Sequence, residues 1–255
     1  MTSVYFIGAG PGDPDLITVK GRKILERADM IIYAGSLVPE TVIACRKKDC
    51  VVHNSAGMSL EEIIAAIGDG VSRGMTVARV HTGDPSIYGA VREQADLLDR
   101  LSISYEIVPG VSSFTAAAAA LKKEFTMPGV SQTVICTRIE GRTPVPDRES
   151  LDSLASHRAS MSIFLSAHLI GPVVEKLRTH YPAGTPAAVV QKATWEDQKI
   201  VTGTLEDIEE KVKKEKIEST ALILVGDFLG TGPETSKLYD KNFSHGFRRS
   251  RCDGE

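Results

Sequence analysis

The stretch VYFIGAGPGDPDLIT (residues 4–18) decides the fold class of this chain. An apolar run leads directly into a turn rich in glycine, and after the turn apolar residues return at helical spacing. Runs that are apolar at nearly every position are typical of parallel strands buried on both faces. A strand, a tight turn and a helix in this order therefore predict the start of a parallel α/β sheet.

The same alternation continues through the first half of the chain. Further strands are expected at 30–34, 50–53, 76–81 and 105–110, after the first at 4–8. Helices are expected at 16–28, 59–74 and 86–101, and Ser59 followed by Glu62 is a capping box that begins the second of them. Repeated strand–helix–strand units with right-handed crossovers predict one parallel sheet.

The second half alternates differently. Strands are expected at 133–137, 162–166, 187–191, 199–204 and 221–226, with helices at 169–180 and 205–215. The loop between 187–191 and 199–204 is short enough for a hairpin, which predicts a mixed sheet.

We therefore expect two α/β domains, residues 1–112 with a parallel sheet and 113–230 with a mixed sheet, and a polar tail at 231–255. The tail is either a mobile end without a role or a segment held to the body by Tyr239, Phe243 and Phe247.

Composition excludes several functions. The 255 residues carry a net charge of −3 with dispersed basic residues and 5% aromatics, which argues against nucleic-acid binding. No apolar run is long enough to cross a bilayer, and the start shows no signal peptide, so we expect no membrane association. The four cysteines, Cys45, Cys50, Cys136 and Cys252, form no C-x-x-C pair, so we expect no metal site and free thiols in a reducing cytoplasm.

The first glycine turn resembles a phosphate-binding loop but lacks its features. The spacing from Gly8 to Gly12 is G-x-G-x-G, and Asp13 stands where the dinucleotide fingerprint needs its third glycine. Pro11 and Pro14 remove N–H donors, and no G-K-[ST] follows as in a Walker A loop. The turn therefore favours a ligand without phosphate, such as S-adenosylmethionine (SAM), or it is only a tight turn between strand and helix.

Two further turns end buried strands, where open α/β sheets bind ligands. HTGDPSIYGA (residues 81–90) contains Asp84, which could accept hydrogen bonds from ribose hydroxyls or a substrate amine, or could cap a helix that begins near Pro85. VPGVSS (residues 108–113) ends in Ser112 and Ser113, which could cap the helix that follows.

In this order and spacing, GAGPGDPDLIT, HTGDPSIYGA and VPGVSS resemble the tetrapyrrole (corrin/porphyrin) methyltransferases over nearly all of residues 3–229. The resemblance implies a SAM-dependent enzyme that releases S-adenosyl-L-homocysteine (SAH). It also implies two α/β domains, a trough between them that holds the active site, and a homodimer. Three longer stretches are similar to the subgroup that methylates carbon 11 of precorrin-4 in cobalamin synthesis: YAGSLVPE (33–40), SQTVICTRIEGRTPVP (131–146) and KATWEDQKIVTGTL (192–205). The residues of HTGDPSIYGA and GRTPVP are more similar to the cobalt-containing branch of that subgroup.

The resemblance also implies the site. The cofactor contacts would be Pro11, Thr82, Gly83, Asp84, Ile87, Ser112, Ser113, Leu165, Ala193, Thr220 and Ala221. Leu165 stands where several relatives carry methionine, and both are apolar. The substrate has many carboxylates, for which we select Arg138 and Arg142; alternatively these two are solvated or pair with Glu140.

Methyl transfer from a sulfonium needs mainly alignment, so the lack of a Cys–His or Ser–His–Asp set is expected. A general base is not evident. His81, Tyr88 and Glu140 are candidates, and each has a simpler structural or substrate-binding explanation. The alternatives are a family member that methylates another ring carbon, a diphthine synthase, or a non-catalytic module that binds SAM or a tetrapyrrole.

Overall fold

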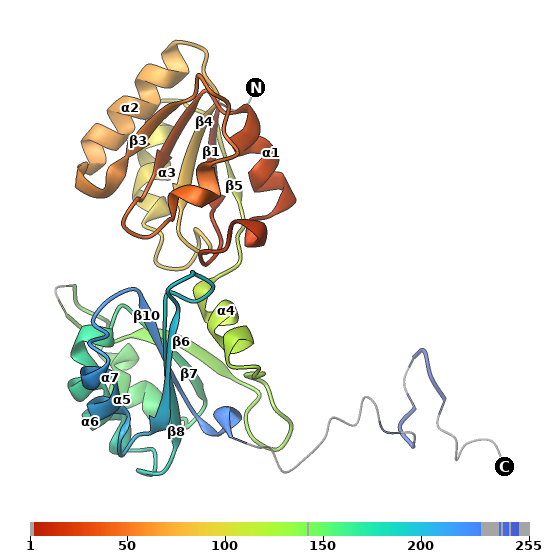
Figure 1. Ribbon diagram of the computed structural model, residues 1–255, viewed down its shortest axis with the longest axis vertical. Helices are drawn as coiled ribbons and strands as arrows, with labels where there is room; N and C mark the ends of the chain where they lie inside the picture. The colour runs from red at the N-terminus through yellow and green to blue at the C-terminus, as the bar shows by residue number, and fades with distance from the viewer. Residues whose placement is uncertain (1–2, 142, 231–239, 241, 245, 250–255) are drawn as a thin grey trace. The chain divides into compact units, whose positions relative to one another are not determined.

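The computed structural model describes residues 3–141, 143–230, 240, 242–244 and 246–249 (Figure 1). Tertiary contacts divide the chain into two compact units. The first comprises Met1–Ala120 and Lys192–Lys199, and the second comprises Leu121–Gln191 and Ile200–Glu255. The first unit extends beyond residue 112 because it includes helix α4 (Ser113–Ala120). The expected domain bounds, 1–112 and 113–230 with a tail at 231–255, stay a prediction.

The first unit contains the expected parallel sheet. Its strand order is β3-β2-β4-β1-β5. The strands are β1 (Val4–Gly8), β2 (Met30–Tyr33), β3 (Val51–Asn54), β4 (Val77–His81) and β5 (Tyr105–Val108). β1 pairs in parallel with both β4 and β5, and β2 pairs in parallel with β3 and β4. Because all five strands run the same way, the turns that follow β1, β4 and β5 leave from one edge of the sheet.

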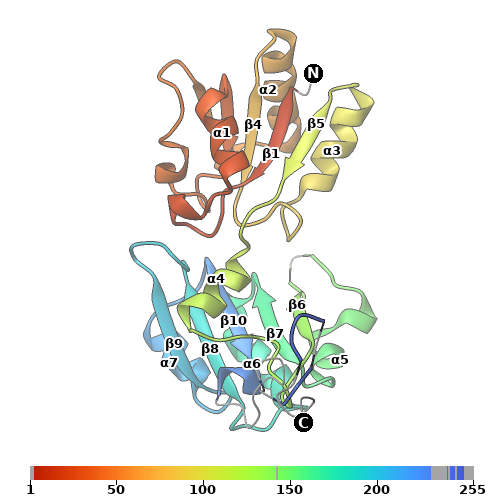
Figure 2. The ribbon, with the colours of Figure 1, turned by 90° about the vertical axis from the view of Figure 1, so that its right-hand side faces the viewer.

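Helices cover both faces of this sheet, as the continuous apolar runs predict. Helix α1 (Val19–Arg27) packs with Ile7 on one face, and helices α2 (Leu60–Ser72) and α3 (Val91–Arg100) pack with Phe6 on the other. Figure 2 shows α1 and α3 on opposite sides of β1. The side chains of neighbouring residues in β1 therefore belong to two separate cores.

Two of the expected helices of this unit show where local signals work and fail. The capping box of α2 is confirmed: the Ser59 hydroxyl accepts the Glu62 N–H, and the Glu62 carboxylate accepts the Ser59 N–H. The expected start of the next helix at residue 86 is wrong, because α3 begins at Val91. Tyr88 and Ala90 adopt left-handed φ of 53° and 48°, which a right-handed helix excludes.

The second unit contains a mixed sheet, as expected, with strand order β6-β7-β10-β8-β9. The strands are β6 (Val134–Arg138), β7 (Ser160–Phe164), β8 (Pro186–Gln191), β9 (Lys199–Thr204) and β10 (Ala221–Val225). β6 and β7 are parallel, whereas β10 is antiparallel to both β7 and β8. β7 begins two residues before the expected position, at Ser160.

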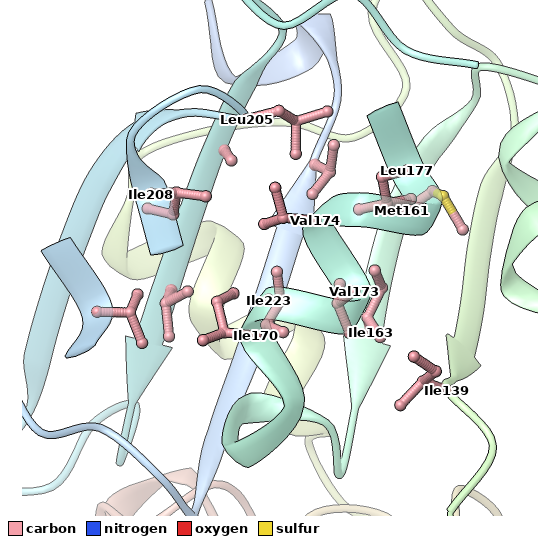
Figure 3. Packing of buried hydrophobic residues seen from close by; sticks show 14 of the residues in the cluster. Ile139, Met161, Ile163, Ile170, Val173, Val174, Leu177, Leu205, Ile208 and Ile223 are labelled. Atoms are coloured by element: carbon pink, nitrogen blue, oxygen red, sulfur yellow. The ribbon is translucent and has the colours of Figure 1, made fainter. Parts of the chain in front are cut away.

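One face of this second sheet carries the core of the unit (Figure 3). Helices α5 (Leu151–Ala155), α6 (Ile170–Arg178) and α7 (Ile208–Lys214) supply Leu151, Val173 and Ile208 to it. Figure 3 shows Val173 and Val174 of α6 facing Ile163 and Ile223 of the sheet. The sequence did not indicate α5.

Short 3-10 segments complete the secondary structure: Pro14–Leu16, Glu40–Ile43, Ser55–Gly57, Asp147–Glu149, Ala167–Leu169 and Asp227–Leu229. Among the described residues, no helix is both long and apolar enough to cross a bilayer.

Candidate functional site

Three turns meet at the carboxyl edge of the first sheet: residues 8–15, 82–90 and 109–113. The Ala9 N–H donates to the His81 carbonyl at 2.8 Å. Gly10 and Gly83 then form an isolated antiparallel bridge, in which each N–H donates to the carbonyl of the other at 3.2 and 2.9 Å. The first and second turns are thus joined backbone to backbone beyond the ends of their parallel strands.

Glycine is required where these turns touch. A Cβ on Gly8 would lie 2.6 Å from the Gly110 Cα and 2.7 Å from the Gly83 carbonyl oxygen. A Cβ on Gly110 would lie 2.2 Å from the same oxygen, and Gly83 has a left-handed φ of 59°. No side chain fits at such distances. We call Gly8, Gly83 and Gly110 the glycine triad, because each of the three turns contributes one member to a single contact.

Asp84 ties the second turn to the third. Its Oδ2 accepts the Gly110 N–H at 2.8 Å, and its Oδ1 accepts the Ser86 N–H at 2.8 Å and the Ser86 hydroxyl. Burial raises the pKa of this carboxyl, but the hydrogen bonds from Ser86 and Gly110 outweigh burial and leave the pKa below its usual value. Asp84 is therefore an anion near neutral pH. It does not cap a helix at Pro85, because the next helix begins at Val91. Its contact with a ribose or an amine stays a prediction.

The serines of the third turn lie beside the triad. A Cβ at Gly83 would lie 3.6 Å from the Ser113 N and 3.7 Å from the Ser112 Cα. The Ser112 carbonyl accepts the Ala116 N–H at 3.2 Å, and α4 begins at Ser113. Thr82 and Ile87 are half-buried in the second turn. The structure therefore brings the predicted cofactor residues of the three turns to one edge of the sheet.

A segment distant in sequence completes this edge. Lys192–Lys199, here called the strap, is grouped with the first unit. The Trp195 Nε1–H donates to the Pro11 carbonyl at 2.8 Å, and the Asp13 N–H donates to the Thr194 hydroxyl at 3.0 Å. Ala193 is buried. The sequence indicated the strap through the family stretch KATWEDQKIVTGTL (192–205) and the contact carried over to Ala193, but it indicated neither hydrogen bond.

Four N–H groups of the first turn donate to other groups of the protein. Those of Ala9 and Gly10 donate to carbonyls of the second turn, and those of Asp13 and Asp15 donate to Thr194 and to the Asp13 carboxylate. A phosphate loop instead keeps its N–H groups for the ligand. The geometry therefore agrees with the sequence argument against a phosphate at this turn.

In the second unit, the predicted residues share one edge of the mixed sheet. Leu165 follows β7, and Ala221 starts β10. Register pairs Ile163 with Ile223 and Arg138 with Phe164, which places Arg138, Leu165 and Ala221 at the same edge.

Leu165 has a left-handed φ of 54° and is 62% exposed, and Thr220 has a φ of 51°. Strained backbone of this kind persists only where the surrounding structure holds it, and it is common at ligand sites.

The candidate substrate residues have other partners within the described chain. Arg138 donates to the carbonyls of Thr143 and Pro144 at 3.0 and 2.8 Å, so it holds the segment that follows β6. Glu140 accepts from Lys176 at 2.5 Å, and this hydrogen bond is the main cause of its lowered pKa. The alternative ion pair between Arg138 and Glu140 is therefore wrong. Arg142 lies outside the described residues.

His81 is poorly suited to act as a general base. The side chain is 5% exposed, its ring lies 5.8 Å from that of Phe6, and Nε2 is buried without a hydrogen-bond partner in the described structure. Burial, with a smaller contribution from Arg79, lowers the pKa of His81 to about 3. A group with this pKa is neutral near pH 7 but accepts protons weakly. Tyr88 is exposed on the second turn with a left-handed backbone.

The family model of the tetrapyrrole (corrin/porphyrin) methylases matches residues 3–209. The chain belongs to this family, which confirms the resemblance seen in the three turns.

Relatives narrow the comparison. The chain is 56% identical to a cobalt-precorrin-4 C(11)-methyltransferase of Methanocaldococcus jannaschii, over 97% of this chain and 96% of the relative. It is 49% identical to a precorrin-4 C(11)-methyltransferase of Pseudomonas aeruginosa, over 96% of this chain and 98% of the relative.

Solved structures agree. The X-ray structure of a cobalt precorrin-4 methyltransferase matches with a TM-score of 0.87 and 48% identity, over 89% of this chain and 96% of that one. Uroporphyrin-III C-methyltransferase from Thermus thermophilus, complexed with S-adenyl homocysteine, matches with a TM-score of 0.73 and 25% identity, over 89% of this chain and 98% of that one.

Replacing one glycine of the triad should separate the turns. We expect Gly8→Ala to lower the free energy of unfolding by roughly 2–4 kcal/mol, because the added methyl group meets backbone atoms that cannot move aside independently. Gly68→Ala, in α2 with open space around it, is the control and should be neutral or stabilise by about 0.5–1 kcal/mol. Urea denaturation measures both. If Gly8→Ala has the same free energy of unfolding as the wild type, the contact between the turns is loose.

His81 should make the protein sensitive to mild acid. The unfolded chain protonates this histidine below its ordinary pKa of 6.5, whereas the folded protein keeps it neutral down to about pH 3. The unfolded state therefore binds more protons in this window, and stability falls as pH falls. His81→Gln should reduce the loss of unfolding free energy between pH 7 and pH 5 by about 2 kcal/mol. His53→Gln, a half-buried position on β3, serves as control. Equal acid sensitivity in His81→Gln and wild type would contradict the prediction.

Proposed function

We propose that this chain is a SAM-dependent methyltransferase that adds a methyl group to carbon 11 of cobalt-precorrin-4 in cobalamin biosynthesis. The observation that carries the proposal is the meeting of the three family turns at the glycine triad, in a chain that aligns over nearly its whole length with C(11)-methyltransferases. Other members of the family that methylate a different ring carbon match less closely, at 33% identity for a uroporphyrinogen-III C-methyltransferase of Bacillus subtilis.

The charges of the three turns fit SAM. They contain Asp13, Asp15 and Asp84 and no lysine or arginine, and Asp84 is ionised near neutral pH. This favours a ligand with positive charge and no phosphate, which describes the sulfonium and amino group of SAM. The complex of the Thermus relative with S-adenyl homocysteine supports the same cofactor class. When bound, SAM supplies an activated methyl group on sulfur.

We propose that the cofactor contacts are those implied by the family resemblance. In the first unit they are Pro11, Thr82, Gly83, Asp84, Ile87, Ser112, Ser113 and Ala193. In the second unit they are Leu165, Thr220 and Ala221. The support from this structure is local: Thr82–Asp84, Ser112 and Ser113 lie at the glycine triad, the strap that contains Ala193 contacts Pro11, and the members in the second unit share one sheet edge.

The protein's task in this reaction is alignment. Transfer of a methyl group from sulfur to carbon is an in-line displacement, and it proceeds when donor and acceptor are held close together without water between them. The positive charge on sulfur disappears as the methyl group leaves, so apolar walls such as Leu165 and Ile87 do not oppose the step. Neither His81 nor Glu140 is in a state suited to remove a proton: the pKa of His81 is about 3, and Glu140 pairs with Lys176.

For the substrate, we propose that Arg138 and Arg142 meet its carboxylates. A guanidinium suits this role because it donates two parallel hydrogen bonds to one carboxylate. Arg138 also donates to the carbonyls of Thr143 and Pro144, the residues that follow Arg142 in the sequence.

Relatives support two forms of the substrate. Those of Methanocaldococcus jannaschii and Priestia megaterium are named for the cobalt form, at 56% and 49% identity. The relative of Pseudomonas aeruginosa, also at 49%, is named for precorrin-4 without cobalt. We propose the cobalt form as the substrate and the metal-free form as the second candidate.

The family resemblance further leads us to propose a homodimer in the cytoplasm that binds neither nucleic acid nor membrane. Sedimentation equilibrium of the purified chain tests the dimer directly.

The decisive experiment gives the purified protein SAM and one of the two substrates. We expect formation of SAH together with a product one methyl group heavier, in which NMR places the new methyl group on carbon 11, and faster turnover with cobalt-precorrin-4. A methyl group on another carbon would point to another branch of the family. SAH binding without turnover of either substrate would favour a non-catalytic module.

The charge of Asp84 should matter for the cofactor. Asp84→Asn keeps an acceptor for the Gly110 N–H but removes the negative charge, so we expect SAM to bind about tenfold more weakly. Asp69→Asn, at an exposed position on α2 outside the three turns, is the matched control and should bind SAM as the wild type does. Calorimetry with SAM measures both. If Asp84→Asn binds SAM with unchanged affinity, the role of Asp84 is only to link the second and third turns.

A further inference from the structure

The strap is the part of the first unit whose role the family turns do not explain. Its own hydrogen bonds hold the segment together. The backbone N–H of Trp195 donates to the Lys192 carbonyl at 2.9 Å, and the Gln198 side-chain oxygen accepts the Thr194 backbone N–H at 2.7 Å. Lys192 pairs with Asp197, and its Nζ lies 5.3 Å from the centre of the Trp195 ring. Lys192 and the Trp195 ring thus form a cation–π pair within the strap.

The backbone of the strap is strained. Lys192 and Thr194 have left-handed φ of 49° and 71°. For a β-branched residue such as Thr194 this conformation is costly and persists only where neighbouring contacts hold it. The result of the strain is specific, because it presents the Thr194 hydroxyl to the Asp13 N–H and the Trp195 indole to the Pro11 carbonyl.

The fit between Trp195 and the first turn leaves no room for a side chain at Gly12. A Cβ on Gly12 would lie 2.1 Å from the Trp195 Cδ1 and 2.4 Å from its Nε1. The indole therefore rests directly on the backbone of the first turn. Gly10 of that turn is hydrogen-bonded to Gly83 of the second turn. The first turn is therefore held at Gly10 by the second turn and at Pro11 and Asp13 by the strap.

We propose that Trp195 is a positioning residue for the methyl donor: it fixes Pro11 and places Ala193, the two proposed cofactor contacts on either side of it. This inference rests on the proposed function. Three observations carry it: the indole hydrogen bond to Pro11, the space at Gly12 that the ring fills, and the strained strap that buries Ala193. Trp195 acts through these neighbours and performs no chemical step.

The test uses SAH binding, which needs no tetrapyrrole. We expect Trp195→Ala to bind SAH about tenfold more weakly in calorimetry, because the partly buried hydrogen bond to Pro11 and the ring contact at Gly12 are lost together. Trp195→Phe keeps the ring but not the N–H and should recover part of the affinity. Glu196→Ala, an exposed neighbour in the strap, is the matched control and should bind as the wild type does.

A double-mutant cycle distinguishes positioning from a general loss of stability. Gly12→Ala should weaken SAH binding in the wild-type background, because the methyl group displaces the indole. In the Trp195→Ala background the clash with the indole is absent and only the strain of an alanine at the Gly12 φ of 159° remains, so the same substitution should weaken SAH binding clearly less than it does in the wild-type background. Purely additive effects would overturn the proposal. Circular dichroism of each variant, compared with Glu196→Ala, confirms that the fold is retained.

Trp195 is the only tryptophan in the sequence, so the tryptophan fluorescence of the protein reports on this residue alone. Addition of SAH to the wild type should change the emission of Trp195 and its quenching by acrylamide. If Trp195→Ala binds SAH with the same affinity as the wild type, this inference is overturned and the proposed function is left intact. Failure of the wild type to bind SAH at all would overturn both.

Discussion

The candidate site depends on a contact that only backbone atoms can make. At the carboxyl edge of the first sheet, Gly8, Gly83 and Gly110 approach so closely that a single methyl group on Gly8 or Gly110 would overlap main-chain atoms. Parallel strands alone cannot fix the loops that follow them, because the ladder ends where the strand ends. The triad extends the order of the sheet into the turns, and Asp84 adds a charged hydrogen bond between the second and third of them.

The two units differ in how their predicted residues are held. In the first, backbone hydrogen bonds and glycine contacts hold Thr82–Asp84 and Ser112–Ser113 in place. In the second, Leu165 and Thr220 owe their places to left-handed backbone at the ends of neighbouring antiparallel strands. Leu165 presents an exposed apolar side chain, whereas Asp84 in the turns presents a carboxylate.

Much of the fold could be predicted from the sequence, because its signals are local. Continuous apolar runs located all five strands of the first sheet to within about two residues, and a short loop indicated the mixed second sheet. The start of α3 could not be predicted, since SIYGA is compatible with a helix by residue type and is excluded only by left-handed backbone at Tyr88 and Ala90. Arg138 was assigned to substrate from its charge, and the structure adds loop carbonyls as its partners. The Trp195 contact joins residues 184 positions apart, and no local pattern records it.

That separation has a consequence for how the site is assembled during synthesis. Residues 1–120 form the larger part of the first unit and leave the ribosome early, but the first turn also donates a hydrogen bond to Thr194 and accepts one from Trp195. Forming the contact between Trp195 and Pro11 closes a loop of 184 positions, which costs chain entropy. A nascent or truncated chain that ends before residue 194 therefore lacks the outer support of the first turn, and the complete site belongs only to a chain whose second half has been made.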